Sequence, residues 1–345
     1  MNRKQLNLGS DLPVVVVAEI GVNHDGRVER AMELVSAARG AGADGVKLQV
    51  FRSATLVHGE GILAEYQKST TDGESSADLL RRYELGEAEL GRVLGYARSL
   101  GMLTVATPFS PSDVAVCGRL GLDAIKIASP DVVNHILLGE AARAGLPLLV
   151  STGAATLEEV GETDGFLGAL GVRAHYLHCV SAYPAPDGLA HLGFIRDLIG
   201  RFGERVGYSD HAPSLLAGAC AVAAGAVLLE RHLTYDTAAV GPDHAASSDP
   251  GQFAEYVRMA RLAETLRGKG HKRLLDVEGD VRRVSRQSLV LALPLERGEA
   301  LTAGHLTTQR PGTGIPPNLA GRFVSRRAKH SLPVGTMLTP EHFLP

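Results

Sequence analysis

The sequence contains no tryptophan, only three cysteines and no apolar run long enough to span a bilayer. Three cysteines cannot build a disulfide framework, and Cys117, Cys179 and Cys220 lack the close spacing of metal-binding motifs. We expect each of them to be a small core residue in a reducing cytoplasm. The polar first ten residues lack the apolar segment of a signal peptide, which also favours a cytoplasmic protein without a membrane partner.

A strong excess of charge of either sign is missing as well, because the formal net charge is −3. This balance gives no reason to expect nucleic acid or an anionic membrane as a partner. The fractions of hydrophobic residues, 45%, and of charged residues, 21%, are those of an ordinary globular protein. A chain of 345 residues exceeds the common domain size and predicts one large domain followed by a small one.

Apolar strand-like runs alternate with amphipathic helix-like runs from residue 13 to about residue 267. The predicted strands are apolar throughout, as expected for parallel strands that are covered on both faces. Eight such units over about 250 residues match a (β/α)8 TIM barrel, and a doubly wound sheet is the alternative because periodicity does not show closure. The predicted strands are Val14–Glu19, Gly45–Gln49, Leu103–Thr107, Ala124–Ser129, Leu146–Thr152, His175–Cys179, Arg205–Tyr208 and Ala226–Glu230.

Helical runs separate these strands, and glycine follows several of them where a left-handed cap would be needed. The predicted helices include residues 27–39, 87–100, 111–120, 156–170 and 215–224, and the predicted cap glycines are Gly40, Gly101, Gly121 and Gly145. The connection 53–82 is unusually long and rich in Ser, Thr, Gly and acidic residues. Because it follows the second strand, we expect it to shape the active site.

The alternation stops after residue 268. We predict a barrel domain over residues 1–268, a charged linker over 269–284 and a compact, loop-rich domain over 285–345. Short strands broken by Gly and Pro are predicted in the last domain at 287–293, 301–302, 310–317 and 332–338.

Two adjacent predicted strands each lead into histidine, in Gly207–His211 and Leu229–His232. In a βαβ unit both strand ends lie on one face of the sheet, so the two imidazoles can reach one metal ion or one substrate. With an oxygen donor such as Glu19 or Gln49 and water, they would suit Mn²⁺, Zn²⁺ or Fe²⁺ rather than Ca²⁺. His24, His178 and His244 also lie near strand ends or loops, but singly.

Two lysines, Lys47 and Lys126, lie inside otherwise apolar strands. Lysine is rarely buried without a partner. Together with Thr107, Ser151 and Ser209, which end neighbouring strands, they predict a cradle for phosphate or carboxylate. The alternative is that the lysines form structural ion pairs with Glu19 or Asp131.

The segment Gly241–Ser248 follows the eighth strand, which would place Asp243 over the barrel mouth. The alternative is a turn that caps the helix beginning near Gln252, with Asp249 and Pro250 as its N-terminal signals. Both can hold for the same loop.

Nine short motifs follow one another at the predicted strand ends. They are Ala18–His24, Lys47–Gln49, Thr107–Ser110, Lys126–Ser129, Ser151–Gly153, His178–Cys179 with Tyr183–Pro186, Tyr208–His211, Leu229–His232 and Gly241–His244. Together with Arg310–Ile315 near the C-terminus, this series resembles the sialic acid synthase family. The resemblance covers residues 14–340 and implies a TIM barrel followed by an antifreeze-like (SAF) domain.

The resemblance also implies an activity, namely condensation of phosphoenolpyruvate with an N-acetylated amino sugar to a nine-carbon α-keto acid. The sugar would be N-acetylmannosamine or a related 6-deoxy diamino sugar, since neuraminate, legionaminate and pseudaminate synthases share the motifs. The metal held by His211 and His232 would be Mn²⁺, with Mg²⁺ or Co²⁺ as alternatives. The catalytic residues implied are Glu19, Lys47, Lys126, Asp131 and Asp243, and the substrate-binding residues are Gln49, Thr107, Ser129, Ser151, Ser181, Tyr183, Ser209 and Arg310.

The same resemblance shows two residues that differ from the usual family pattern, and it implies how the subunits assemble. Asp131 stands where many members carry glutamate as a proposed base, and Ser181 stands where asparagine is frequent. Arg310 would enter the active site of a partner subunit, which implies a domain-swapped homodimer. The competing interpretations are a metal-dependent barrel aldolase or hydrolase, and a non-enzymatic module that binds ice or sugar.

Overall fold

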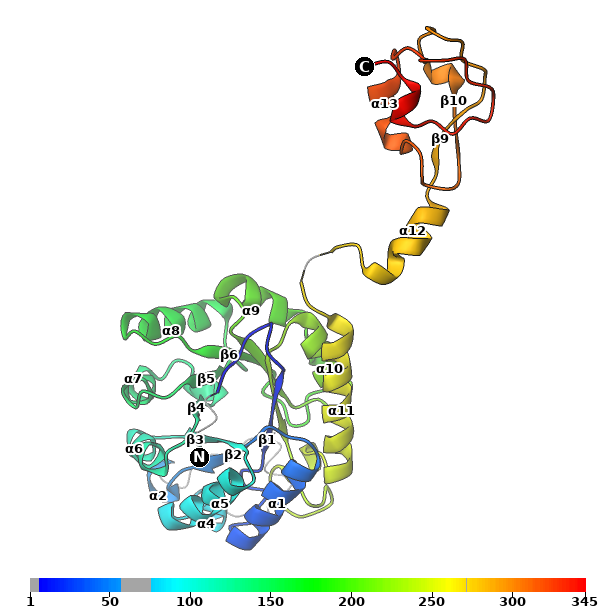
Figure 1. Ribbon diagram of the computed structural model, residues 1–345. Coiled ribbons are helices and arrows are strands. Elements are labelled where there is room, and N and C mark those ends of the chain that lie inside the picture. The colour runs from blue at the N-terminus through cyan, green and yellow to red at the C-terminus, as the bar shows by residue number, and fades with distance from the viewer. Residues whose placement is uncertain (1–5, 57–75, 271) are drawn as a thin grey trace. The chain divides into compact units, whose positions relative to one another are not determined.

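Eight parallel strands form a closed barrel in the first part of the computed structural model, which describes residues 6–56, 76–270 and 272–345 (Figure 1). Each strand pairs with the next in chain order, and β8 pairs with β1, so the doubly wound alternative is wrong. The strands are β1 Val15–Glu19, β2 Gly45–Val50, β3 Leu103–Pro108, β4 Ala124–Ile127, β5 Leu148–Ser151, β6 His175–Cys179, β7 Val206–Asp210 and β8 Leu228–His232.

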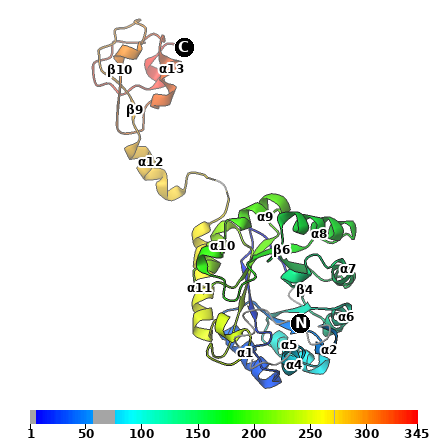
Figure 2. The same cartoon turned by 180° about the vertical axis from the view of Figure 1, so that it is seen from behind.

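Helices surround the strands on the outside of the barrel, as the two opposite views show (Figures 1 and 2). Their inward faces and the outward faces of the strands form one continuous apolar core. The helices are α1 Val28–Gly40, α2 Ser53–Leu56, α4 Ser76–Tyr83, α5 Glu87–Ser99, α6 Pro111–Leu120, α7 His135–Arg143, α8 Leu157–Ala169, α9 Phe194–Phe202, α10 Ala217–Ala224 and α11 Pro250–Arg267.

Three of the four predicted cap glycines have the left-handed conformation, with φ of 71° at Gly101, 63° at Gly121 and 68° at Gly145. The prediction for Gly40 is wrong, because Gly40 is the last residue of α1 and the positive φ, 89°, is found at Gly42. At the start of α11, the Asp249 side chain accepts a hydrogen bond from the backbone N–H of Gln252. The predicted capping turn is therefore confirmed, and the helix begins at Pro250.

The predicted core position of Cys220 is also wrong. Cys117 and Cys179 are buried, but Cys220 is exposed. It lies on α10, which turns Ala217, Ala221 and Val222 toward the core and leaves Cys220 on its outer face.

An apolar layer inside the barrel explains why the site lies where it does. Val17, Val105, Ala124, Leu149, Leu177 and Leu228 form one cluster, drawn from six of the strands. Side chains two residues apart on a strand point to the same side. The positions two residues further along, still inside the barrel, are Glu19, Thr107, Lys126, Ser151, Cys179 and Glu230.

The remaining two strands carry glycine at the level of the apolar layer, Gly45 on β2 and Gly207 on β7. A Cβ atom on Gly207 would lie 2.4 Å from Leu177 Cδ2, so the layer has no room for a side chain there. Lys47 and Ser209 follow these glycines two residues later. The polar layer above the apolar floor therefore receives one residue from every strand.

A second compact unit begins at Gly270, and the first ends at Lys269. In the second unit β9, Ser288–Leu291, pairs antiparallel with β10, Leu306–Gln309, over a small core that includes Leu295, Ile315 and Leu338. The predicted linker contains a short exposed helix, α12 Gly279–Ser285. The strand predicted at 310–317 is wrong, because Pro311, Pro316 and Pro317 lack the N–H groups that a ladder requires and the segment is a loop.

Across the described parts of the chain, none of the helices combines the length and the apolar character needed to cross a membrane.

Candidate active site

The carboxyl ends of the strands surround a cavity of about 440 Å³, a size that suits two small substrates. Most of the predicted site residues line it. These are Lys47, Gln49, Thr107, Lys126, Ser129, Ser151, Ser181, Tyr183, Ser209, His211, His232 and Asp243.

The two predicted lysines meet around a carboxylate that was not predicted, that of Glu230 on β8. Glu230 Oε1 lies 3.2 Å from Lys47 Nζ and 3.5 Å from Lys126 Nζ, and it accepts a hydrogen bond of 3.0 Å from Ser209 Oγ. Lys47 Nζ also lies 2.6 Å from Glu19 Oε2. The predicted alternative of structural ion pairs therefore holds for Lys47 and Glu19, whereas Lys126 pairs with Glu230 and not with Asp131.

Burial shapes the ionisation of this cluster. The pKa of Lys47 falls from 10.5 to about 8, because burial disfavours the ammonium ion and the attraction of Glu230 only partly offsets this. For Glu230, burial raises the pKa, but Lys126 and Lys47 outweigh it, so the pKa lies below the usual range. The carboxylate is therefore ionised and offsets part of the positive charge of the lysines.

Hydroxyl groups form the wall next to Lys126. Ser129 Oγ accepts a hydrogen bond of 3.0 Å from the backbone N–H of Gly153. A Cβ atom on Gly153 would lie 2.3 Å from Ser181 Oγ, so the hydroxyls can converge only because residue 153 is glycine. Ser151 Oγ is buried and has no hydrogen-bond partner among the described residues. A buried, unpaired hydroxyl beside two lysines is suited to hold an anionic oxygen.

Part of the cavity lining is apolar. Val22, Phe51 and Tyr83 form a small cluster against which Leu56, Leu80 and Phe109 pack. All of these except Phe51 line the cavity. The ends of the predicted long connection 53–82 thus contribute to the site, and its residues 57–75 lie outside the described part of the chain.

The two predicted histidines lie side by side, with ring centroids 5.5 Å apart. His211 Nδ1 is 2.9 Å from the carbonyl oxygen of Val180, which can only accept, so this nitrogen carries a proton. His232 Nδ1 is buried, has no hydrogen-bond partner in the described structure and lies 3.6 Å from Asp243 Oδ2. Burial lowers the pKa of His232 well below its usual value, which keeps the imidazole neutral.

These features fit a divalent metal ion. Histidine ligands of metals usually donate their second N–H to a carbonyl or carboxylate, as His211 does to Val180. Within the described residues, no group of three His, Cys, Asp or Glu side chains is arranged to hold a metal ion. The two histidines would therefore supply part of the coordination, and oxygen atoms of substrate and water would supply the rest.

Three predicted residues are not among those that line the cavity. Glu19 lies in the polar layer, where its Oε1 accepts a hydrogen bond of 2.6 Å from Gly21 N–H, and it reaches the cavity through Lys47. Asp131 does not line the cavity, and its carboxylate accepts a hydrogen bond of 2.9 Å from Asn134 Nδ2. Arg310 is an exposed residue of the second unit.

A buried ion pair on the outer side of β7 and β8 joins the two strands at the ends where the histidines lie. Asp210 and Arg231 are register partners, and Arg231 Nη1 donates a hydrogen bond of 2.9 Å to Asp210 Oδ2. Arg231 Nε also donates to Ser248 Oγ, at 2.7 Å. Asp210 and Arg231 each directly precede one of the histidines. The pair therefore fixes the positions of His211 and His232 relative to one another along the strand direction.

Asp210→Asn should lower the free energy of unfolding by about 3–5 kcal/mol, because it leaves the Arg231 charge buried without its counter-ion. The measurement is urea denaturation followed by circular dichroism. Glu140→Gln is the matched control, since it breaks an exposed pair with Arg143 and should cost no more than about 1 kcal/mol. Equal losses in the two variants would contradict a structural role for the Asp210–Arg231 pair.

Comparison with known proteins agrees with this architecture. The profile described as the NeuB family matches residues 34–272, and the profile of the SAF domain matches residues 286–344. The N,N'-diacetyllegionaminic acid synthase of Legionella pneumophila is 37% identical over 97% of this chain and 96% of its own length. The N-acetylneuraminate-9-phosphate synthase of Mus musculus is 30% identical over 92% of this chain and 90% of its own length.

Solved structures of similar proteins also superimpose on most of this chain. A putative spore coat polysaccharide biosynthesis protein E from Chromobacterium violaceum superimposes with a TM-score of 0.82 at 26% identity and covers 96% of this chain and 100% of its own. The N-acetylneuraminic acid synthetase of Leptospira borgpetersenii, solved with citrate, gives a TM-score of 0.73 at 27% identity over 81% of this chain and 94% of its own.

Proposed function

This chain belongs to the NeuB family, and its relatives include proteins named as synthases of N,N'-diacetyllegionaminic acid, N-acetylneuraminate 9-phosphate and pseudaminic acid. We propose that it condenses phosphoenolpyruvate with a six-carbon amino sugar to a nine-carbon acid and phosphate. The observation that carries the proposal is the pairing of two sites in one cavity. Lys47, Lys126 and the neighbouring hydroxyl groups, which we call the lysine wall, line the same cavity as the His211–His232 pair.

Phosphoenolpyruvate would bind at the lysine wall. Its phosphate and carboxylate carry negative charge throughout the reaction, and Lys47 and Lys126 are fixed in place before it enters. The hydroxyls of Thr107, Ser129, Ser151, Ser181 and Ser209, together with Tyr183, would complete the hydrogen bonds. The buried unpaired hydroxyl of Ser151 supports this assignment.

The sugar would bind next to His211, His232 and Asp243, with Gln49 and Glu19 on the adjoining strands. We propose that the two histidines hold a divalent metal, with Mn²⁺ as the first candidate and Mg²⁺ or Co²⁺ as alternatives. When bound, such an ion supplies Lewis-acid polarisation of the open-chain aldehyde oxygen. Asp243 and Gln49 would hold the sugar hydroxyls so that one face of the aldehyde meets phosphoenolpyruvate.

The bonds that change follow from the two reactants. C3 of phosphoenolpyruvate attacks the aldehyde carbon, and the positive charge that develops at C2 is quenched by water. The resulting tetrahedral carbon expels phosphate by cleavage of its C–O bond, which leaves the keto group. We assign the base that accepts the proton of the water to Asp243 rather than Asp131, because Asp243 lines the cavity and burial raises its pKa to about 6.

The choice of sugar rests on the apolar residues that line the cavity, which we call the apolar wall. Val22, Leu56, Leu80 and Phe109 offer no hydrogen bonds to the hydroxyls of N-acetylmannosamine, whereas they suit the methyl and acetyl groups of a 6-deoxy sugar with two acetamido groups. Two legionaminic acid synthases, 37% and 33% identical, are among the relatives. We therefore propose the diacetamido sugar of the legionaminate type as the preferred substrate.

Phosphate release tests the proposed function directly. The purified protein is incubated with phosphoenolpyruvate, Mn²⁺ and, in turn, N-acetylmannosamine and the diacetamido precursors of legionaminic and pseudaminic acids. We expect the highest kcat/KM with the legionaminate precursor. No phosphate release with any of the three sugars would reject the proposed function, and a preference for N-acetylmannosamine would reject only the assignment of the apolar wall.

Lys47 should make phosphoenolpyruvate binding sensitive to alkaline pH. Its pKa of about 8 means that the ammonium ion is lost as the pH rises through that value. The kcat/KM for phosphoenolpyruvate should fall to about half of its plateau near pH 8 and then decline toward about tenfold per pH unit at higher pH. Lys47→Arg, which stays protonated, should abolish this alkaline limb at a lower overall rate. An unchanged alkaline limb in Lys47→Arg would contradict the assignment.

Arg310 is proposed to act in the active site of a second subunit, as part of a domain-swapped homodimer. If so, the barrel of an Arg310→Ala subunit should regain activity when it is co-expressed with an otherwise inactive Lys126→Met subunit, which still provides Arg310. The measurement is the turnover of purified mixed dimers, with each variant alone as the control. Absence of any recovery would show that Arg310 acts within its own subunit or not at all.

A further inference from the structure

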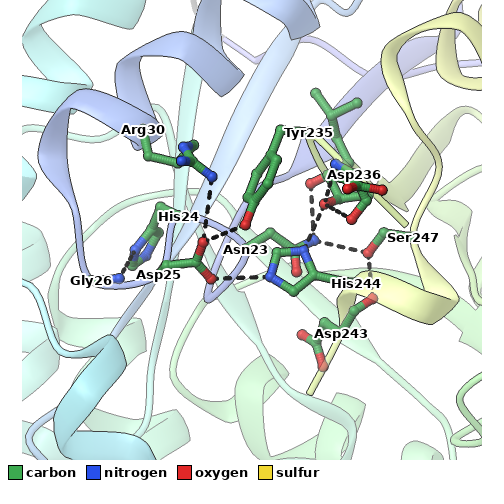
Figure 3. Close-up of polar contacts among 12 residues, drawn as sticks. Asn23, His24, Asp25, Gly26, Arg30, Tyr235, Asp236, Asp243, His244 and Ser247 are labelled. Carbon is green, nitrogen blue, oxygen red and sulfur yellow. Dashed lines mark hydrogen bonds and ion pairs between the residues drawn. The ribbon is translucent and has the colours of Figure 1, made fainter. Parts of the chain in front are cut away.

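A network of hydrogen bonds joins the loop after β1 to the loop after β8 (Figure 3). Asp25 Oδ1 lies 3.0 Å from His244 Nε2, and Asp25 Oδ2 accepts a hydrogen bond of 2.8 Å from the Tyr235 hydroxyl. Arg30 lies 3.5 Å from the same carboxylate and stacks 3.8 Å above the Tyr235 ring. We call these four residues the Asp25 clasp.

Both nitrogens of His244 are used by this network. Nδ1 lies 2.7 Å from Thr234 Oγ1, and a carboxylate can only accept, so Nε2 carries a proton that it donates to Asp25. His244 is fully buried, with 0% of its surface exposed. A histidine with both nitrogens engaged is not available as a base, so its contribution is to hold the loop.

The same two loops are joined a second time, through Asn23 and Ser247 (Figure 3). Asn23 Nδ2 donates hydrogen bonds of 3.0 Å to the carbonyl of Leu233 and 2.8 Å to Ser247 Oγ. Ser247 Oγ in turn donates a hydrogen bond of 2.6 Å to the carbonyl oxygen of Asp243. The backbone of Asp243 is thus held through its own carbonyl and through its neighbour His244.

The loop after β1 has a backbone that needs such support. Val22 and Asp25 have φ of 56° and 53°, in the left-handed region that residues with a Cβ atom disfavour. A β-branched residue such as Val22 is especially rare there. The contacts of Asn23 and Asp25 with the loop after β8 hold this conformation in place.

The Asp243 carboxylate has no part in the clasp. Its Oδ2 lies 3.6 Å from His232 Nδ1, and the side chain lines the cavity. The direction in which the side chain points depends on where its backbone is held. We propose that Asp25 and His244 are positioning residues, which fix Asp243 against His232 in the proposed synthase reaction. The inference rests on the proposed function for its effect on turnover, and on the structure alone for its effect on the loop.

A double-mutant cycle tests the proposal. Asp25→Asn should lower kcat about 10- to 100-fold and leave the KM for phosphoenolpyruvate within about twofold, since a misplaced catalytic group affects turnover rather than binding at the lysine wall. The double variant with Asp243→Ala should be no slower than Asp243→Ala alone, because the clasp acts only through Asp243. A further loss of the same factor in the double variant, or an unchanged kcat in Asp25→Asn, would overturn it.

Asp164→Asn is the matched control, because Asp164 also pairs with an arginine and a tyrosine, Arg205 and Tyr176, near the opposite end of the barrel. It should leave kcat within about twofold of the parent protein. Amide hydrogen exchange gives a measurement that does not need activity. Residues 241–248 should exchange at least about tenfold faster in Asp25→Asn and remain unchanged in Asp164→Asn. Equal protection of this loop in both variants would overturn the clasp, even in a protein that proved inactive as a synthase.

Discussion

Replacing Lys126 by methionine should lower kcat/KM for phosphoenolpyruvate by about 10²–10³-fold, because removing one partner of a buried charge pair costs about 2–5 kcal/mol of binding. Lys126 has 3% of its surface exposed, and methionine nearly matches its volume, so the barrel should remain folded. The loss should appear largely in the KM for phosphoenolpyruvate, because the lysine attracts its charge in the ground state as well as in the transition state. Initial rates over a range of substrate concentrations measure both parameters.

Lys272→Met provides the control for this prediction, since Lys272 is an exposed residue that pairs with Glu278 within the second unit. It should leave both kinetic parameters within about twofold of the parent protein. A Lys126→Met protein that melts at the parent temperature and retains full activity would show that phosphoenolpyruvate does not bind at the lysine wall.

His211→Ala and His232→Ala should each reduce turnover by about 10³-fold or more. Polarisation of a carbonyl by a metal ion is worth several kcal/mol, and each 1.4 kcal/mol is about a factor of ten in rate. Either variant should also lose Mn²⁺ affinity, which is measured without substrate from the free Mn²⁺ signal in electron paramagnetic resonance. A circular dichroism spectrum equal to that of the parent protein separates loss of the ion from loss of the fold.

His178→Gln is the matched control for the histidine variants. His178 lies on β6, and its Nε2 is bonded at 2.8 Å to the carbonyl of Ala190, away from the other two imidazoles. Its replacement should leave Mn²⁺ affinity unchanged. If His211→Ala and His232→Ala bound Mn²⁺ as tightly as the parent protein, the histidine pair would have no role as a metal site.

The sequence was sufficient to predict the barrel because its signals are local and repeated. Apolar strands and helical runs alternate, and polar residues such as Lys47, Thr107 and Ser151 follow the strand interiors at each carboxyl end. The period of two along each strand places these residues directly above the apolar layer. The grouping of most site residues around one cavity follows from that geometry.

Other features depend on contacts that no local pattern reveals. Glu230 was missed, although a glutamate inside an apolar strand is the same kind of signal as Lys47, because its two lysine partners come from β2 and β4. Asp131 follows a strand end as predicted, yet it turns toward Asn134 in a short helical turn. The role of His244 needed the position of Asp25, which lies 219 residues earlier in the chain.

The fate of the bridging oxygen of phosphoenolpyruvate tests the central claim most directly. The protein is incubated with phosphoenolpyruvate labelled with ¹⁸O between C2 and phosphorus, Mn²⁺ and the diacetamido legionaminate precursor, and both products are analysed by mass spectrometry. The account predicts an unlabelled nine-carbon keto acid and inorganic phosphate that carries the label. Label retained in the keto acid, or no nine-carbon acid at all, would contradict it.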